Sequence, residues 1–197
     1  MNILIDLVPI TVEIEGEDYE INSNFRTSVL FELLMQDKSI SEENKIIQAL
    51  QLYYPVIPSN INIAIDRMLW FYRCGKYIVP SKGTGKGKSK QIYNFEYDDD
   101  YIYSAFLDQY GIDLQDIEYL HWWKFKAMFK SLKEGNEIVK IMGYRSMDLS
   151  KIKDKEEKKY YRKMQELYKI PINKDEKDKL EEINNILLNG GDIDIVL

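Results

Sequence analysis

The residue types that most often perform covalent chemistry are scarce in this chain. Its 197 residues include a single cysteine, Cys74, and a single histidine, His121. One cysteine cannot form a disulfide within the chain, and these counts exclude a zinc site built from several Cys and His ligands. Arg73 and Lys76 would lower the pKa of the Cys74 thiol, but the C-terminal end of a helix would raise it, so we do not expect a reactive thiol.

His121 is the one imidazole that could act as a general base. It stands between Leu120 and Trp122, and no serine or cysteine nucleophile lies near it in an identifiable motif. A histidine beside two tryptophans on a helix is more often a packed or half-exposed ring than a catalytic group. We therefore expect a structural role for this side chain.

Three consecutive carboxylates, Asp98, Asp99 and Asp100, form a pattern that could suit a hard metal ion. Consecutive side chains at a helix start point in different directions, whereas a metal cage needs ligands that converge from several elements. Carboxylates also interact favourably with the positive N-terminal end of a helix. The triplet therefore predicts a capped helix start rather than a metal site.

Residues 80–90, PSKGTGKGKSK, resemble the end of a phosphate-binding P-loop. The motif needs four residues between its glycines, and three separate Gly83 from Gly87. A P-loop also follows a buried strand and opens a helix, and neither flank has that character. The stretch predicts a flexible basic loop instead. Because no motif combines a nucleophile, a base and an oxyanion site, we expect neither an enzyme nor a cofactor.

The most unusual segment is 119–133, YLHWWKFKAMFKSLK, which combines aromatic rings with four lysines and no acid. Three interpretations remain open: a basic stacking surface for nucleic acid, a core stripe with lysines on the solvated face, and a groove or patch for a partner helix. Seven aromatic, His or Met positions in the first eleven residues exceed what one buried face needs. On the third interpretation the partner-binding residues are Tyr119, Trp122, Trp123, Phe125, Met128 and Phe129.

A hairpin and three helices are expected in the first half of the chain. Apolar and polar residues alternate on both sides of Gly16, which predicts a hairpin over 10–22. After the hairpin the apolar residues recur at helical spacing. The available helix N-caps are Asn24 or Thr27, Ser41, and Ser59 or Asn60, and Gly75 suits a helix C-terminus. The expected buried stripes are Val29, Leu30, Leu33 and Leu34, then Ile46, Ile47, Leu50 and Tyr53, then Ile61, Ile65, Met68, Leu69 and Tyr72.

The second half of the sequence predicts a short strand over 92–95, followed by helices. One helix opens at the aspartate triplet and closes at Gly111, and Asp113 caps a long helix that carries the aromatic segment. A short helix over 137–142 is broken by Gly143, a charged helix covers 151–169, and a last helical segment covers 181–188. The prediction is one mainly helical domain over 1–170, with a small N-terminal hairpin and a flexible Gly/Lys loop over 80–90, followed by a variable helical tail over 171–197.

The formal charge of −6 and the pI near 5.0 weigh against wholesale nucleic-acid binding. The charges are segregated, since acids dominate residues 1–48 while bases dominate 80–90, 119–133 and 151–169. No apolar run approaches the ~20 residues that a membrane span needs, and the first ten residues lack the basic flank of a signal peptide. We expect a cytosolic protein with no membrane partner.

Several sequence blocks are shared with one known family. They include WFYRCGK at 70–76, IEYLHWWKF at 117–125 and MGYRSMDLSKIKD at 142–154. On these blocks the chain resembles the bacteriophage gene-product-fifteen family, a group of siphophage tail-module proteins from phages and prophages of Gram-positive hosts. The likeness runs from about residue 3 to residue 168, and residues 171–197 look like a variable tail.

The resemblance implies a function in tail assembly. The family is typically encoded between the major tail protein and the tape-measure protein, which implies a chaperone that binds the tape-measure protein in the host bacterial cytoplasm. Such a chaperone keeps its client soluble until tail-tube subunits replace it, so the tail-tube protein and self-association are further expected contacts. The family offers no catalytic residues to carry over. The alternative is a nucleic-acid-binding phage accessory protein that uses the basic loop and the Trp/Lys-rich helix.

Overall fold

The chain folds into a mainly helical structure with a small hairpin, as the sequence predicts. The computed structural model describes residues 2–76 and 90–171, and all structural statements refer to them. The strands are β1 (Thr11–Ile14) and β2 (Glu17–Glu20), and the helices are α1 (Phe25–Gln36), α2 (Glu42–Tyr53), α3 (Ile61–Tyr72), α4 (Asp99–Tyr110), α5 (Trp122–Lys130), α6 (Glu137–Ser146) and α7 (Lys155–Leu167). The predicted helix over 181–188 and nearly all of the 80–90 loop lie outside the described residues.

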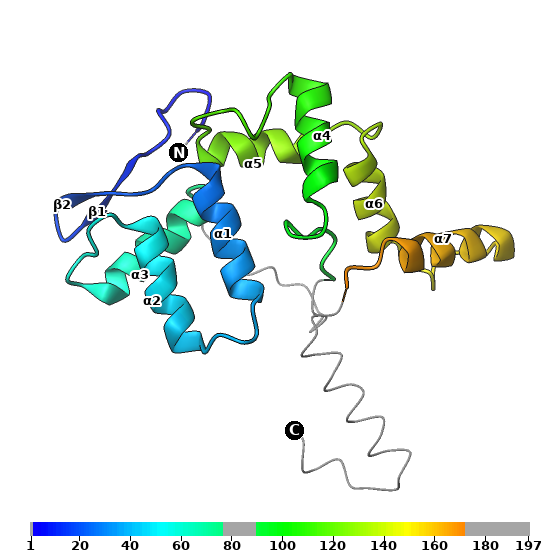
Figure 1. Cartoon of the computed structure of the whole chain (residues 1–197), viewed down its shortest axis with the longest axis horizontal. Coiled ribbons are helices and arrows are strands. Elements are labelled where there is room, and N and C mark those ends of the chain that lie inside the picture. Colours follow the sequence, from blue (N-terminus) through cyan, green and yellow to red (C-terminus); the bar gives the residue numbers. More distant parts are fainter. Residues whose placement is uncertain (1, 77–89, 172–197) are drawn as a thin grey trace, which may run out of the picture.

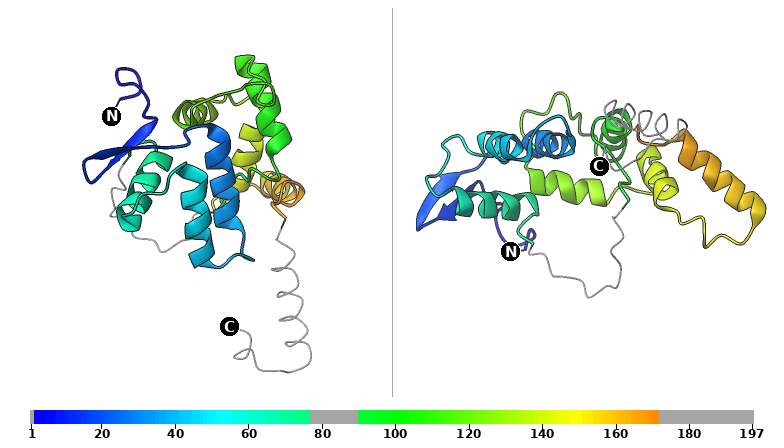
Figure 2. Two further views of the ribbon diagram at one scale, coloured as in Figure 1. Left: turned by 60° about the vertical axis from the view of Figure 1, so that its left-hand side comes forward. Right: turned by 90° about the horizontal axis from the view of Figure 1, so that it is seen from below.

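The helices form two groups on either side of α5 (Figure 1). The hairpin packs on α3, α3 on α2, α2 on α1, and α1 on α5. In the other group α4 packs on α6, and α6 on α7. The view from below in Figure 2 also places α5 between the two groups. A short helix thus links them.

The hairpin over 10–22 is confirmed. Val12 and Ile14 are buried while Thr11 and Glu13 face solvent, so one face of β1 rests on the helices. The strands pair antiparallel across a two-residue turn in which Glu15 and Gly16 both have positive φ, a geometry that suits tight hairpins.

The predicted N-caps of the first three helices are also confirmed. The side chains of Asn24, Ser41 and Asn60 each accept a hydrogen bond from a backbone N–H of the first turn. The predicted stripes are wrong in part, since Leu30, Ile46, Ile47 and Ile61 are exposed. Small or aromatic side chains that the pattern did not rank occupy the helix contacts instead: Ser28, Phe31, Ala49, Ala64 and Phe71.

Two predictions before α5 are wrong. Residues 92–95 form no strand, because the Asn94 side chain accepts hydrogen bonds from the N–H groups of Glu96 and Tyr97 and folds the backbone into a turn. Asp113 caps no long helix; its carboxylate stabilises a short turn at 114–116, and α5 begins only at Trp122. The chain stays extended before α5 because residues 120–122 pair with residues 23–25, through Phe25 N–H to Leu120 C=O and Trp122 N–H to Ser23 C=O, both 2.8 Å.

The helices near the C-terminal end also differ from their predictions. Gly143 does not break α6, which continues to Ser146. A helical glycine costs about 1 kcal/mol relative to alanine, and the contacts of the next turn offset it. The charged helix is shorter than predicted, beginning at Lys155 after the capping side chain of Asp154 and ending at Leu167. It contains no buried residue.

One buried ion pair joins α4 to α6. Asp98 and Arg145 are 1% and 6% exposed, and they form two hydrogen bonds of 2.6 and 2.9 Å. Arg145 also donates to the carbonyls of Ile92 and Tyr168. The prediction that an aspartate side chain caps the helix is therefore wrong for Asp98, whose carboxylate makes no cap hydrogen bond.

Candidate binding site around helix α5

The structure places most of the predicted partner-binding residues in the core. Trp122, Trp123, Phe125 and Phe129 are buried, Met128 is half-buried, and Tyr119 is exposed. Stacked rings join α5 to both groups, with Phe125 lying 4.8 Å from Phe25 of α1 and from Phe106 of α4. A partner-binding role for the six residues stays a prediction, and Tyr119 and Met128 are the members with accessible side chains.

The two tryptophans of α5 also fasten it to the end of α3. The indole N–H groups of Trp122 and Trp123 donate to the carbonyls of Tyr72 and Phe71 at 2.8 and 2.7 Å. These carbonyls belong to the last turn of α3, where helix carbonyls lack partners within the helix. The tryptophans thus act as a C-terminal cap for a helix about 50 residues earlier in the chain.

His121 has the structural role expected of it. Its Nδ1 accepts the N–H of Trp123 at 3.0 Å, so the ring is the N-cap of α5, and Nε2 donates to the Pro9 carbonyl at 2.9 Å. Burial lowers the pKa of His121, which favours the neutral ring that this pattern requires.

An apolar cavity of about 230 Å³ lies along α5. Aromatic side chains of α5 form one wall, and Ile92, Phe95, Val139 and Met142 form much of the rest. The volume is close to that of a few aliphatic side chains. The aromatic stripe is therefore core on one side and the wall of a cavity on the other.

A second, basic cavity of about 470 Å³ adjoins the first. It is lined by four cations, Arg73, Lys76, Lys126 and Lys130, and by no acid. Lys126 and Lys130 line both cavities. Among the described residues none of the four cationic side chains forms an ion pair or a hydrogen bond. We call the two cavities together the α5 cleft.

Lys126 occupies the boundary between the two cavities. Its ammonium lies 4.5 Å from the centre of the Tyr72 ring and 4.9 Å from that of Trp122, which are cation–π contacts. Burial lowers its pKa. Behind it, the buried Glu32 carboxylate accepts the hydroxyl of Tyr72 at 2.6 Å and that of Tyr93 at 3.4 Å, and burial raises the Glu32 pKa. The floor of the cleft is thus a satisfied polar network, in which the Glu32 carboxylate lies near the charge of Lys126.

Cys74 lines the basic cavity but is poorly suited to be a nucleophile. Burial raises the pKa of its thiol, although Lys126, Lys130 and Lys76 act in the opposite direction. This agrees with the expectation of an unreactive thiol, but the main cause is burial rather than the helix end. In the described ranges, no group of three or more His, Cys, Asp or Glu is placed to hold a metal ion.

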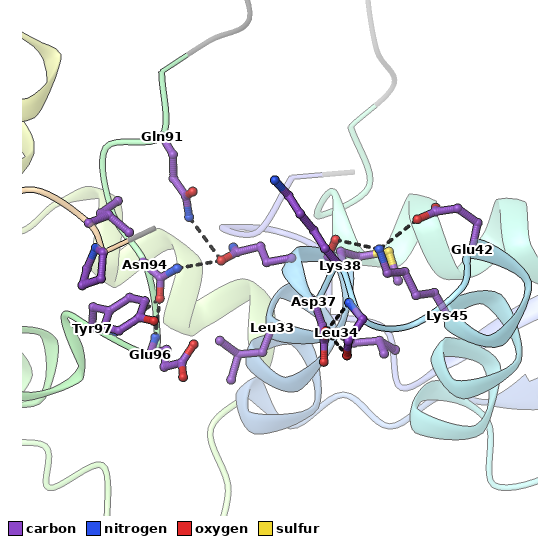
Figure 3. A pocket seen from close by; sticks show the side chains of 15 residues that line it. Leu33, Leu34, Asp37, Lys38, Glu42, Lys45, Gln91, Asn94, Glu96 and Tyr97 are labelled. Carbon is purple, nitrogen blue, oxygen red and sulfur yellow. Dashed lines mark hydrogen bonds and ion pairs between the residues drawn. The ribbon is translucent and has the colours of Figure 1, made fainter. Parts of the chain in front are cut away.

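A larger groove, of about 1000 Å³, lies between the two groups of helices (Figure 3). The side chains of Gln91 and Asn94, both labelled in Figure 3, donate to the amide oxygen of Gln36 at 3.2 and 2.7 Å. The lining carries three acids and two lysines, and Lys45 is already paired with Glu42 at 2.8 Å. The groove therefore has mixed charge, whereas the α5 cleft joins an apolar wall to a lining whose charged residues are all cations.

The α5 cleft is suited to binding rather than to bond making. An apolar cavity and a basic cavity that share two lysines fit a ligand with apolar and anionic groups side by side. Sequence reasoning identified the aromatic wall but missed the contribution of Arg73 and Lys76. The signal for it was the absence of any acid between Lys76 and Phe95, together with the i, i+4 spacing of the two shared lysines.

A family model described as Bacteriophage Gp15 protein matches residues 4–170. No curated protein and no solved structure is detectably similar to the chain. The match covers well over half of the sequence, so the chain belongs to the Bacteriophage Gp15 family. Membership makes it a bacteriophage protein and suggests a structural or assembly-related role.

Proposed function

We propose that this Gp15-family chain is a non-enzymatic tail assembly chaperone. It binds the tape-measure protein in the host bacterial cytoplasm and keeps that protein soluble until tail-tube subunits replace it. A tape-measure protein is a long helical chain with apolar stripes, and such stripes aggregate when they are uncovered. A chaperone for it needs apolar side chains that are exposed before the client arrives.

The observation that carries this proposal is the uncovered apolar segment before β1. Leu4 and Leu7 are 90% and 93% exposed, and Ile5 and Ile10 are also exposed. Asn2 and Ile3 of the same segment line the basic cavity, so the segment borders the α5 cleft. Monomeric proteins rarely expose a run of large aliphatic side chains unless a partner covers it.

The chemistry of the surface agrees with a client of variable sequence. Aliphatic side chains on a segment outside the helices and strands can adapt to different apolar partners, and such a surface favours promiscuous binding over a single fitted ligand. The net charge of −6 would help a loaded complex to remain soluble. The described part of the chain contains no helix long and apolar enough to span a membrane.

The decisive experiment is co-expression of the full chain with the cognate tape-measure protein. We expect the client to become soluble and to co-purify. Replacing Leu4, Ile5 and Leu7 with serine should reduce co-purification about tenfold, because exposed anchors contribute to binding and not to the core. If the client is no more soluble with the chain than without it, the proposal is wrong.

A matched control separates the N-terminal segment from exposed apolar surface in general. Val56 and Ile57 are also exposed, in the connection between α2 and α3. Replacing both with serine should leave co-purification unchanged. An equal loss in both variants would mean that binding is not localised to the segment before β1.

Nucleic-acid binding is the second candidate, and the basic cavity favours it. Arg73 and Lys76 lie where the chain leaves α3, Lys126 and Lys130 lie on α5, and the sequence of residues 82–90 contains four more lysines. Binding of this kind weakens steeply as salt rises, because each neutralised phosphate releases counterions. A gel-shift titration with DNA and RNA at low ionic strength tests it, and the absence of any shift would eliminate this function.

A further inference from the structure

We propose that the α5 cleft is a binding site for an acidic, apolar polypeptide segment, and that residues 180–197 of the same chain are that segment. This goes beyond the chaperone function and does not depend on it. It concerns what occupies the cleft when no client is present.

The cleft has two unmet requirements. Arg73, Lys76 and Lys130 line one cavity without an ion pair among the described residues. Lys126, which is half-buried, also forms no ion pair there and has the buried Glu32 as its electrostatic neighbour, so the cavity as a whole carries an excess of positive charge. The adjoining cavity presents an apolar wall that is open to an inserted side chain. The complementary ligand is one that carries carboxylates and aliphatic side chains within a few residues of each other.

Residues 180–197, LEEINNILLNGGDIDIVL, have this composition. They contain four acids, Glu181, Glu182, Asp192 and Asp194, nine aliphatic residues and no base. The four acids equal in number the four cations of the basic cavity. The segment lies outside the described residues.

The described chain ends close enough to the cleft for the segment to reach it. Arg145 donates to the Tyr168 carbonyl at 2.6 Å and to the Ile92 carbonyl at 3.2 Å, and Ile92 lines the apolar cavity. Residues 168 and 92 are therefore held together at the edge of the cleft. The eight residues from 172 to 179 can span up to ~29 Å when fully extended, so no second copy of the chain is required. A tether of this length places the segment at roughly millimolar effective concentration.

The groove of Figure 3 lies nearer to the exit of the chain, since Ile170 and Pro171 line it, but its charge is wrong for this segment. Asp37, Glu42 and Glu96 outnumber its two lysines, and one of those, Lys45, is already paired. Acids of the segment would meet like charge there and opposite charge in the α5 cleft. Charge complementarity therefore selects the more distant site.

Cys74 gives a direct test, because it is the one cysteine of the chain and it lines the basic cavity. The rate at which N-ethylmaleimide alkylates Cys74 in the full chain, without client, measures how well the cavity is covered. Reversing the four acids (E181K, E182K, D192K and D194K) should raise this rate about tenfold, and so should high salt in the unaltered chain. Equal rates in the unaltered and reversed chains would overturn the proposal.

Two further variants separate covering of the cavity from a change in thiol pKa. The uncharged change I183S, L187S and I195S leaves the field at Cys74 unaltered and should also accelerate alkylation. Reversal of Asp175, Glu176 and Asp178, which lie before the proposed segment, should not. If charge reversal accelerates alkylation but the serine variant does not, the segment acts through the thiol pKa at a distance and the cleft is not its site.

Cross-linking identifies the occupant. In the L187C variant a short bismaleimide should join the introduced thiol to Cys74 within one chain at low protein concentration. A cross-linked dimer instead would mean that a second copy fills the cleft. Protection of Cys74 only after addition of a single-stranded oligonucleotide would assign the cleft to nucleic acid. All of these measurements omit the tape-measure protein, so their failure leaves the chaperone proposal standing, and failure of co-purification leaves this one standing.

Discussion

The two groups of helices are held in place by different forces. Around α5 the contacts are aromatic, as Phe125 stacks with Phe25, Phe106, Trp122 and Phe129. Many buried rings share the stabilisation there, so the loss of one contact leaves others. Between α4, α6 and the end of α7, by contrast, a single guanidinium holds together Asp98 and two backbone carbonyls. The first region is stabilised by buried rings, and the second adds a buried ion pair to the buried aliphatic side chains of Ile138 and Ile141.

Helix α7 is also held by few contacts. It buries no residue, and it contacts α6 through tyrosine rings packed on Tyr144 and through the Gln165 amide, which donates to the carbonyls of Tyr144 and Met147. A helix with so little buried area is expected to open at low free-energy cost. The chain is therefore rigid around the cleft and weakly attached where the C-terminal residues begin.

Truncating the ring at the centre of the aromatic region should cause the largest loss of stability. Phe125→Ala removes a fully buried ring and leaves a cavity between α1, α4 and α5, which should cost about 3–5 kcal/mol of unfolding free energy. Urea denaturation followed by far-UV circular dichroism measures this loss. A loss below about 1 kcal/mol would mean that neighbouring rings refill the space and that the region is less tightly packed than the distances indicate.

Arg145→Ala tests the second region and should cost about 3 kcal/mol, because it leaves the buried Asp98 carboxylate without its counter-charge. Limited proteolysis should also release α7 much faster, since the Tyr168 carbonyl loses its donor. Lys140→Ala is the matched control. Its ion pair with Glu137, at 3.1 Å, is exposed and should contribute less than about 0.5 kcal/mol. Similar losses in both variants would contradict the special role given to Arg145.

Two glycines with similar positive φ angles differ in what surrounds them. Gly75 and Gly111 have φ of +69° and +63°, so alanine is strained at either position by about 1 kcal/mol. A Cβ at Gly75 would lie 2.9 Å from the Trp123 ring, whereas a Cβ at Gly111 meets nothing within 4 Å. We expect Gly75→Ala to cost roughly 2 kcal/mol and Gly111→Ala roughly 1 kcal/mol in thermal unfolding. Equal losses would show that Trp123 shifts freely.

The smallest expected effect is a pH dependence of stability caused by His121. Burial holds the pKa of His121 below its ordinary value of 6.5, so between the two pKa values the unfolded chain binds more protons than the folded chain. The stability contributed by neutral His121 is therefore present above pH 6.5 and is lost as the pH falls below it. His121→Asn keeps an N-cap acceptor without a titrating ring. As the pH falls from about 7.5 to about 5.5, the unaltered chain should lose unfolding free energy relative to the His121→Asn variant. If the difference between the two proteins does not change with pH, His121 is not a neutral cap.

Local sequence signals predicted the parts of the fold that local contacts determine. The hairpin around Gly16 and the caps at Asn24, Ser41 and Asn60 depend on neighbours within four residues, and they were predicted correctly. The start of α5 could not be predicted from its own segment, because pairing with Ser23 and Phe25 keeps the preceding residues extended. The pattern at 92–95 likewise predicts a strand, whereas Asn94 folds these residues into a turn.

The candidate site was predicted in the same uneven way. The aromatic wall could be recognised from one segment, since Trp122, Phe125 and Phe129 recur at helical spacing. The basic cavity could not, because it joins Arg73 and Lys76 at the end of α3 to lysines about 50 residues later. The closeness of those segments depends on the tryptophan hydrogen bonds to the last turn of α3, which no pattern in the sequence displays.

The capping of α3 by the tryptophans of α5 also sets an order of events during synthesis. Trp122 follows its acceptor by 50 positions, so at ~5–20 residues per second the ribosome needs about 3–10 s to deliver it. Through that interval the nascent α1, α2 and α3 have no α5 against which to bury Phe25 and Phe71. A protein whose proposed task is to cover another chain's apolar surface must first pass through a stage in which its own is uncovered.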